Sequence, residues 1–178
     1  MTKNLFESLF RIRVSSNGTV RVSARSEMDC HKDTCSEMEG GTPARSWGYV
    51  RRRGLHDLSC EAAEDKCDGA GGCEVTHRMM RSYRVGRRGQ RMEDIMYEVM
   101  TQGPVLALME VTRDLFSYKE GIYRRLEAEV VGHHAVRIVG WGEEAGVRYW
   151  RLANTWGEAW GERGLFRIGQ KGQVYNSQ

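Results

Sequence analysis

The sequence has no apolar run long enough to cross a bilayer, since no stretch approaches the roughly 18 residues that a membrane-spanning helix needs. Its first residues, MTKNLFESLFRIRV, lack the basic start, apolar run and small-residue cleavage site of a signal peptide. No internal repeat or low-complexity linker divides the 178 residues. We therefore expect one globular domain without a membrane span.

A strong charge imbalance is also missing. The 27 basic and 24 acidic residues leave a net charge of +3, which is too small to indicate nucleic-acid binding by itself. A hydrophobic content of 40% is enough to build a core in a chain of this length. The overall composition is that of an ordinary globular protein with a mildly basic surface.

The cysteines include no CxxC pair, and all five fall in the first half of the chain. Structural zinc sites usually take their ligands in such short pairs, so the clustering of three cysteines with His77 is a weak zinc candidate. We expect no metal and no cofactor. Because five is an odd number, one thiol stays unpaired whichever disulfides form. The cysteines are Cys30, Cys35, Cys60, Cys67 and Cys73.

Apolar periodicity predicts helices mainly in the first part of the chain. The second of these helices is expected to begin after Pro43 and to bury Trp47 and Val50. Gly54 is a natural stop for it. The predicted helices span residues 3–13, 43–54 and 92–100.

Short strands separated by glycine-containing turns dominate the rest of the chain and predict an antiparallel meander. The change from helix to strand predicts an α+β fold with two lobes in one domain, helical over about 1–102 and β-rich over 103–178. The predicted strands are Val105–Val111, His134–Trp141, Val147–Asn154 and Leu165–Ile168.

Two neighbouring predicted strands carry a histidine and an asparagine, in GHHAVRIVGWG and ANTWGEAWGERGLFRI. A histidine such as His134 can take a proton from a thiol, and the Asn154 amide at its other ring nitrogen would fix its tautomer. Spacing alone favours a plainer interpretation, in which His134 is a buried histidine, Asn154 a cap, and Trp156 and Trp160 core aromatics. The complete strings favour the catalytic interpretation.

These strings resemble the histidine and asparagine motifs of papain-family cysteine peptidases, and QGPVLALMEVTRDLFSYKEGIY resembles the cathepsin B branch. Within that branch, ALMEV, GWGEE, AWGERG and WGYVRRRG are most similar to the tubulointerstitial nephritis antigen group, secreted matrix proteins with serine in place of the nucleophilic cysteine. The resemblance implies a papain-like two-lobed fold, a single domain over residues 1–178 that is incomplete at both ends, and an extracellular or lysosomal location.

The resemblance also assigns roles to individual residues. His134 matches the catalytic histidine, Asn154 its orienting asparagine, and Trp156 the indole that shields their hydrogen bond. Gly40 and Gly41 match a glycine pair whose backbone holds an extended substrate strand. The substrate-binding residues implied in this way are Gly40, Gly41, Trp156 and Trp160.

The same resemblance implies that the nucleophile half of the site is missing. Aligned back from Cys30, Met1 falls a few residues after the family's nucleophile, and the oxyanion-hole glutamine lies further upstream. Met38 stands where the family has a cysteine that bridges to one beside the nucleophile. The segment GQKGQVYNSQ lacks the family's following cysteine and final strand, so the C-terminus also looks trimmed.

We therefore expect a pseudopeptidase that acts by binding rather than proteolysis. The alternative is a fragment of an active cysteine endopeptidase. Family-type disulfide roles suit Cys30 and Cys60 better than a replacement nucleophile would. The loop between Gly54 and Tyr83 has no paired histidines like those of the cathepsin B occluding loop, so trimming of dipeptides is not expected.

Arginines recur through RMMRSYRVGRRGQR. The plainer interpretation is a solvated basic edge. The functional alternative is a polyanion-binding module for glycosaminoglycan or nucleic acid, which Arg51, Arg52 and Arg53 would extend. The expected partners are an extracellular-matrix protein or glycosaminoglycan, and a peptide in the residual cleft. The recurring arginines are Arg78, Arg81, Arg84, Arg87, Arg88 and Arg91.

Overall fold

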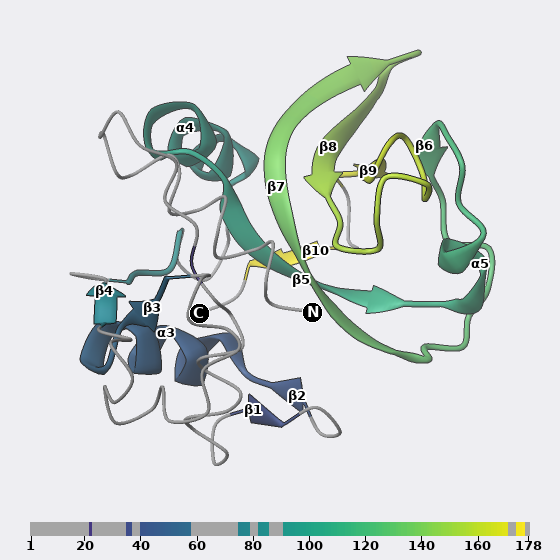
Figure 1. The fold of residues 1–178 in the computed structure, drawn as a ribbon. Helices are drawn as coiled ribbons and strands as arrows, with labels where there is room; N and C mark the ends of the chain where they lie inside the picture. Colours follow the sequence, from purple (N-terminus) through teal and green to yellow (C-terminus); the bar gives the residue numbers. More distant parts are fainter. Residues whose placement is uncertain are drawn as a thin grey trace. The chain divides into compact units, whose positions relative to one another are not determined.

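The computed structural model describes residues 22, 35–36, 40–57, 75–78, 82–85, 91–170 and 174–176 (Figure 1). The chain forms two compact units, one mainly of residues 84–177 and the other mainly of residues 2–83. The first unit contains the large sheet and helix α4 (Met92–Gln102), and the second contains helix α3 (Pro43–Arg52). The predicted helix over residues 3–13 lies outside the described residues. The predicted lobe boundary near residue 102 stays a prediction.

Helix α3 (Pro43–Arg52) is the main element of the smaller unit. Pro43 takes the first helical position, where its fixed φ suits the helix and its missing N–H is not needed. Gly54 follows the helix at a φ of +86°, as its predicted stop requires. The helix buries Tyr49 and Val50, whereas Trp47 is only partly buried against their cluster.

Two short strand pairs are also described in this unit. Strand β1 (Cys35–Ser36) pairs with β2 (Gly40–Gly41), and β3 (Leu55–His56) pairs with β4 (Val75–His77). Both pairs are antiparallel.

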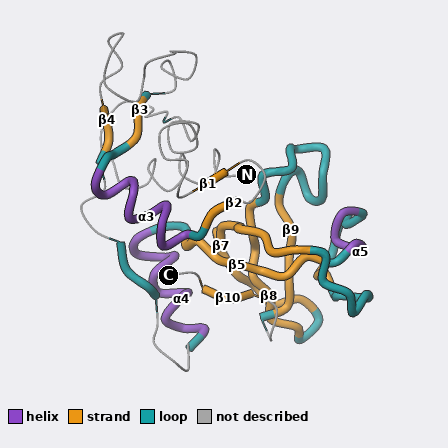
Figure 2. The backbone as a smooth tube through the Cα atoms, turned by 90° about the horizontal axis from the view of Figure 1, so that it is seen from below, coloured by secondary structure: helices purple, strands orange, loops and turns teal. Residues whose placement is uncertain are grey.

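A six-stranded sheet, in the order β10-β5-β7-β8-β9-β6, forms the larger unit (Figures 1 and 2). The four central strands are antiparallel neighbours, which confirms the predicted meander. Strand β6 is parallel to β9, and β10 is antiparallel to β5. The strands are β5 (Val105–Val111), β6 (Ile122–Tyr123), β7 (Gly132–Glu144), β8 (Val147–Ala153), β9 (Leu165–Gly169) and β10 (Val174–Asn176).

Strand β10 corrects one expectation. The C-terminal segment was expected to lack a final strand, yet its residues pair with β5 between Ala107 and Met109. Three residues are too few to show a hydrophobic alternation in the sequence. The strand forms because β5 offers it a row of backbone partners.

Helix α4 (Met92–Gln102) packs its apolar face on the sheet, and the shorter α5 (Arg113–Phe116) follows β5. Ile95 on α4 is buried among sheet residues. The helix ends at Gly103, whose φ is +97°, immediately before Pro104. No helix among the described residues is long and apolar enough to span a membrane.

The core of the larger unit is built from alternate residues of β5, β7, β8 and β9, because successive side chains of a strand point to opposite faces. Phe166 on β9 is fully buried and contacts the rings of Tyr118 and Trp160. Helices and a largely antiparallel sheet together confirm the α+β class. The buried cluster consists of Ile95, Ala107, Met109, Val111, Leu115, Tyr118, Val136, Ile138, Trp150, Leu152, Phe166 and Ile168.

Replacing Phe166 with alanine is expected to lower the free energy of unfolding by about 3–5 kcal/mol, because it leaves a cavity in this core. Denaturant unfolding followed by tryptophan fluorescence measures the change. Met100→Ala is the control, since Met100 is 70% exposed. Equal losses for the two variants would contradict the position given to Phe166.

Candidate active site

His134 and Asn154 come together where β7 and β8 pair. Nε2 of His134 lies 2.8 Å from Oδ1 of Asn154, and both side chains are buried. The same Oδ1 accepts the backbone N–H of Thr155 at 2.7 Å, which identifies it as the amide oxygen. Nε2 must therefore carry the hydrogen of this bond, and Nδ1 of the neutral ring is left as an acceptor.

Nδ1 of His134 is buried and has no hydrogen-bond partner among the residues that the structure describes. An unpaired buried acceptor is unusual, because most buried polar atoms in proteins are hydrogen-bonded. On a neutral imidazole this nitrogen is the basic one. The arrangement thus presents a base whose other nitrogen is already occupied by Asn154.

Aromatic rings cover the pair. The Trp156 ring stacks on His134 with centroids 5.1 Å apart, and the Phe116 ring stacks on Trp156 at 5.0 Å. Trp160 meets Trp156 edge-on at 4.9 Å and donates its indole N–H to the carbonyl of Phe116 at 3.2 Å. Trp160 therefore supports Trp156, and its substrate-binding role stays a prediction. Sequence patterns gave no reason to single out Phe116.

Burial under these rings lowers the pKa of His134, because removal from water disfavours the charged imidazolium. The hydrogen bond to Asn154 acts in the opposite direction and favours the protonated form. Burial is the larger effect, so the net pKa lies below the ordinary value for histidine. His134 is consequently neutral near pH 7 and is competent to accept a proton.

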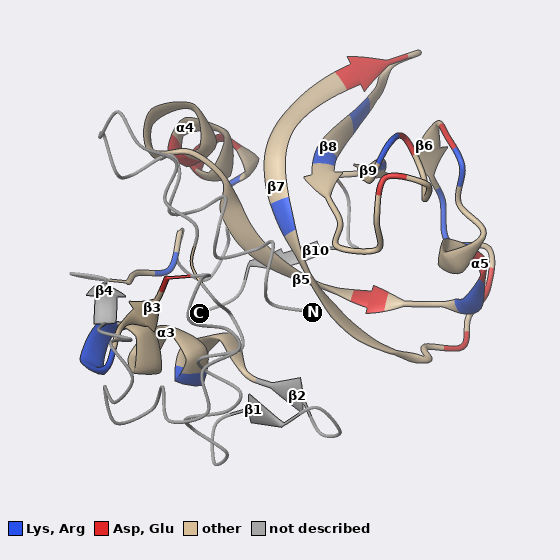
Figure 3. Ribbon diagram, in the orientation of Figure 1, with Lys and Arg blue, Asp and Glu red and all other residues tan. Residues whose placement is uncertain are grey.

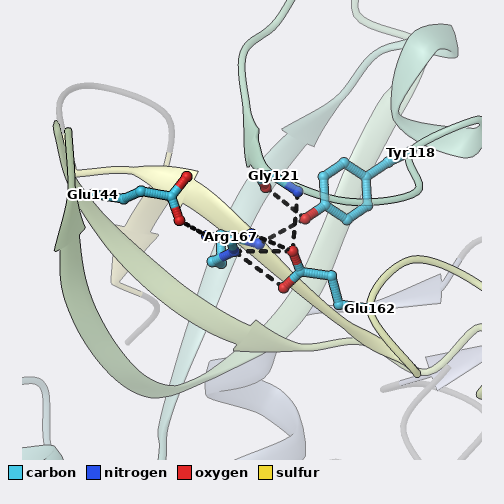
Figure 4. Close-up of polar contacts among 5 residues, drawn as sticks. All are labelled: Tyr118, Gly121, Glu144, Glu162 and Arg167. Atoms are coloured by element: carbon cyan, nitrogen blue, oxygen red, sulfur yellow. Dashed lines mark hydrogen bonds and ion pairs between the residues drawn. The ribbon is translucent and has the colours of Figure 1, made fainter.

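A polar network fixes the turn that carries these tryptophans (Figure 4). The guanidinium of Arg167 on β9 binds Glu162 through Nε and Nη2, and binds Glu144 through Nη1 at 2.5 Å. Glu162 also accepts the backbone N–H of Gly121 at 3.0 Å. The hydroxyl of Tyr118 donates to the carbonyl of Gly121 at 2.6 Å. The network therefore ties the tryptophan turn to the loop after α5 and to the end of β7.

Partial burial raises the pKa of Glu162, but its hydrogen bonds with Arg167 and Gly121 outweigh that effect, so its net pKa lies below the ordinary value. Bidentate arginine–carboxylate pairs of this kind are strong and directional. Glycines let the chain turn here, since Gly161 and Gly164 adopt φ values of +58° and +81°. Sequence analysis missed this network, although GERGLFR contains both charged partners.

The other predicted site residues are placed as follows. Gly40 and Gly41 form β2, in the unit of residues 2–83, and pair with Ser36 and Cys35. Arg78 lies in that unit, whereas Arg84 and Arg91 lie in the other, and all three are exposed. The remaining predicted residues lie outside the described part of the chain: Arg81, Arg87, Arg88 and the cysteines Cys30, Cys60, Cys67 and Cys73.

The described residues contain no cluster of three or more metal-ligating side chains. The zinc candidate of the sequence analysis includes three cysteines that lie outside those residues. The candidate site rests on the His134–Asn154 pair, whose geometry suits acid–base chemistry.

Comparison with known proteins identifies one family. The profile of the papain family of cysteine proteases matches residues 2–177. A cathepsin B-like cysteine proteinase of Schistosoma japonicum is 32% identical over 193 residues, which cover 89% of this chain and 56% of that protein. The human tubulointerstitial nephritis antigen-like protein is 34% identical over 199 residues, covering 89% and 43%. The chain spans about half the length of the curated relatives it matches.

Solved structures agree with this assignment. Procathepsin B S9 from Trypanosoma congolense superposes with a TM-score of 0.79 at 27% identity, covering 99% of this chain and 66% of that one. A Carica candamarcensis cysteine protease, CMS1MS2, superposes with a TM-score of 0.70 at 22% identity, covering 97% and 86%. The predicted papain-like fold is confirmed.

Removing Trp156 should raise the pKa of His134, because Trp156→Ala returns the imidazole to water. Asn154→Ala should lower it further, because the imidazolium loses its hydrogen-bond acceptor. Histidine NMR titration of each variant measures the shift.

Trp141→Ala is the matched control, because it removes an indole of the same size that does not stack on His134. The pKa of His134 should move in opposite directions in Trp156→Ala and Asn154→Ala. A shift in the same direction would contradict the opposing effects of burial and of the Asn154 hydrogen bond.

Glu162→Gln is expected to lower the free energy of unfolding by about 1.5–3 kcal/mol at neutral pH, the range for hydrogen bonds to charged groups. Because the folded pKa of Glu162 is depressed, its contribution is present above the unfolded pKa and is lost as pH falls through the folded one. Denaturant unfolding from neutral to acid pH should therefore show the two proteins converging.

The exposed Glu143, which is 3.5 Å from Arg148, supplies the comparison. Glu143→Gln should change stability by at most about 0.5 kcal/mol, as for surface ion pairs. If the difference in free energy of unfolding between the wild type and Glu162→Gln stayed constant down to strongly acid pH, the Glu162 charge would not be the source of the stabilisation.

Proposed function

The chain belongs to the papain family of cysteine proteases, and from that premise we propose a cathepsin B-like pseudopeptidase of the tubulointerstitial nephritis antigen type, which acts by binding rather than by proteolysis. One combined observation carries this proposal. The His134–Asn154 pair is complete at 2.8 Å, while none of the five cysteines in the sequence matches the family's nucleophile motif.

A cysteine nucleophile needs a thiolate, which proteins stabilise at a helix N-terminus or beside a cation. Cys35 lies in the two-residue strand β1 and therefore has no helix N-terminus of its own. In a serine protease, removal of the nucleophile alone costs about a millionfold in kcat. Because no cysteine of this sequence matches the family's nucleophile motif, the 178 residues are expected to have no useful peptidase activity.

An exposed aromatic surface beside His134 supports a binding function. Phe116 is 54% exposed and stacks on Trp156, so an apolar surface adjoins the buried histidine. Exposed aromatic rings of this kind often contribute to peptide and protein contacts. The similarity to the human tubulointerstitial nephritis antigen-like protein favours an extracellular-matrix protein as partner and an extracellular location.

The 178-residue chain is expected to hydrolyse no fluorogenic peptide amide and to take up no thiol-directed epoxide probe. Hydrolysis is followed by fluorescence, and labelling by intact-protein mass spectrometry. His134→Ala is the control, and it should behave as the wild type does in both assays.

The competing function is a fragment of an active cysteine peptidase. Hydrolysis that thiol-blocking reagents abolish and that His134→Ala removes would establish it and overturn the pseudopeptidase. The intact mass and N-terminal sequence of the native protein provide a second test. A preceding segment of the form QGxCxxCW would also overturn the proposal.

A further inference from the structure

The end of strand β4 places Arg78 at the same end of the β3–β4 pair as three consecutive arginines at the end of helix α3. Arg51 and Arg52 lie in the last turn of α3, and Arg53 caps it. Leu55, two residues later, pairs with His77 in the antiparallel β3–β4 pair. Arg78 therefore leaves β4 at the same end of this pair at which α3 enters it.

These four residues, called here the α3–β4 basic patch, are all exposed. None of them has an acidic partner among the residues that the structure describes. Figure 3 shows the last turn of α3 in blue. Asp57 is the one described acidic residue of the unit of residues 2–83, and it lies beyond the opposite end of β3. Among the residues that the structure describes, no carboxylate therefore compensates the positive charge of the patch.

Helix stability explains only part of this charge. Basic residues in a last turn interact favourably with the partial negative charge of a helix C-terminus, which accounts for Arg51 and Arg52. The Arg52 guanidinium also lies back along the helix, beside Gly48. The helix does not account for Arg53, which follows its end, or for Arg78, which comes from a separate strand. The helix terminus contributes only about half a negative charge, which is much less than the charge of the four described arginines.

We propose that the α3–β4 basic patch binds a sulfated glycosaminoglycan. Guanidinium groups form paired hydrogen bonds with the oxygens of anions such as sulfate and carboxylate, and they stay charged at any physiological pH. Single-stranded nucleic acids bind through exposed aromatic rings on which bases stack. The aromatic residues of α3 are not free for that purpose, because Tyr49 is buried and Trp47 packs on the core.

The patch is a subset of the polyanion module predicted from sequence, which included Arg78 and could extend to Arg51, Arg52 and Arg53. Arg84 and Arg91 of that module belong to the unit of residues 84–177, whereas all four patch arginines belong to residues 2–83. The inference goes beyond the pseudopeptidase function and does not depend on it, since no patch residue belongs to the histidine site.

The test is binding of a heparin oligosaccharide of defined length to the full chain, measured by titration calorimetry at several salt concentrations. With a slope of about −0.7 per neutralised charge on a flexible polyanion, four arginines predict about a 50-fold loss of affinity between ~50 and ~200 mM salt. Arg53→Gln/Arg78→Gln should reduce that slope by about half.

The matched control is Arg113→Gln/Arg124→Gln, which removes the same charge from two exposed arginines of the other unit. It should leave the slope nearly unchanged, as should Arg84→Gln/Arg91→Gln. If the control and patch variants lost heparin affinity equally, the effect would come from net charge alone, and the proposed site would be wrong. Equal affinity for unsulfated hyaluronan, or tighter binding of a single-stranded DNA of matched charge, would overturn the sulfated ligand.

Discussion

The antiparallel pairing of β7 with β8 is the constraint on which the site depends. Arg137 pairs with Ala153, so the next residue of the second strand, Asn154, arrives beside the segment that carries His134. A shift of one residue would turn these side chains to opposite faces of the sheet, because strand side chains alternate. The 2.8 Å hydrogen bond between them is therefore a direct consequence of strand register.

The turn that carries Trp156 and Trp160 connects the polar network to the His134–Asn154 pair. Trp156 and Trp160 precede Glu162, and Arg167 anchors Glu162 from β9. The tryptophans remove water from the imidazole, while the ion pair fixes the turn that carries them. Burial alone would make His134 a poorer base, and Asn154 partly offsets this by favouring the protonated ring. The chemistry of the ring is thus set by groups on three strands and a turn.

Sequence patterns predicted the elements whose apolar residues recur at a regular spacing or whose ends carry a proline or glycine signal. Strand β5 alternates buried residues, α4 has a helical period, and Pro43 with Gly54 brackets α3, so their bounds matched closely. His134 and Asn154 were recognised through their motifs. The short elements α5, β6 and β10 were missed because two to four residues cannot show a period, and tertiary pairing determines them. Trp47 proved only partly buried because its neighbours Tyr49 and Val50 fill the core.

Nδ1 of His134 has no hydrogen-bond partner among the residues that the structure describes, which bears on what the site could contact. An unsatisfied buried polar atom costs on the order of 1–3 kcal/mol, so an apolar residue would stabilise the same position better if it served only as core. Asn154, Trp156 and Phe116 all orient or cover that imidazole rather than replace it. A group that donates a hydrogen bond to Nδ1 would remove the cost. The ring geometry is therefore suited to a ligand group that donates a hydrogen bond, such as an amide or a hydroxyl.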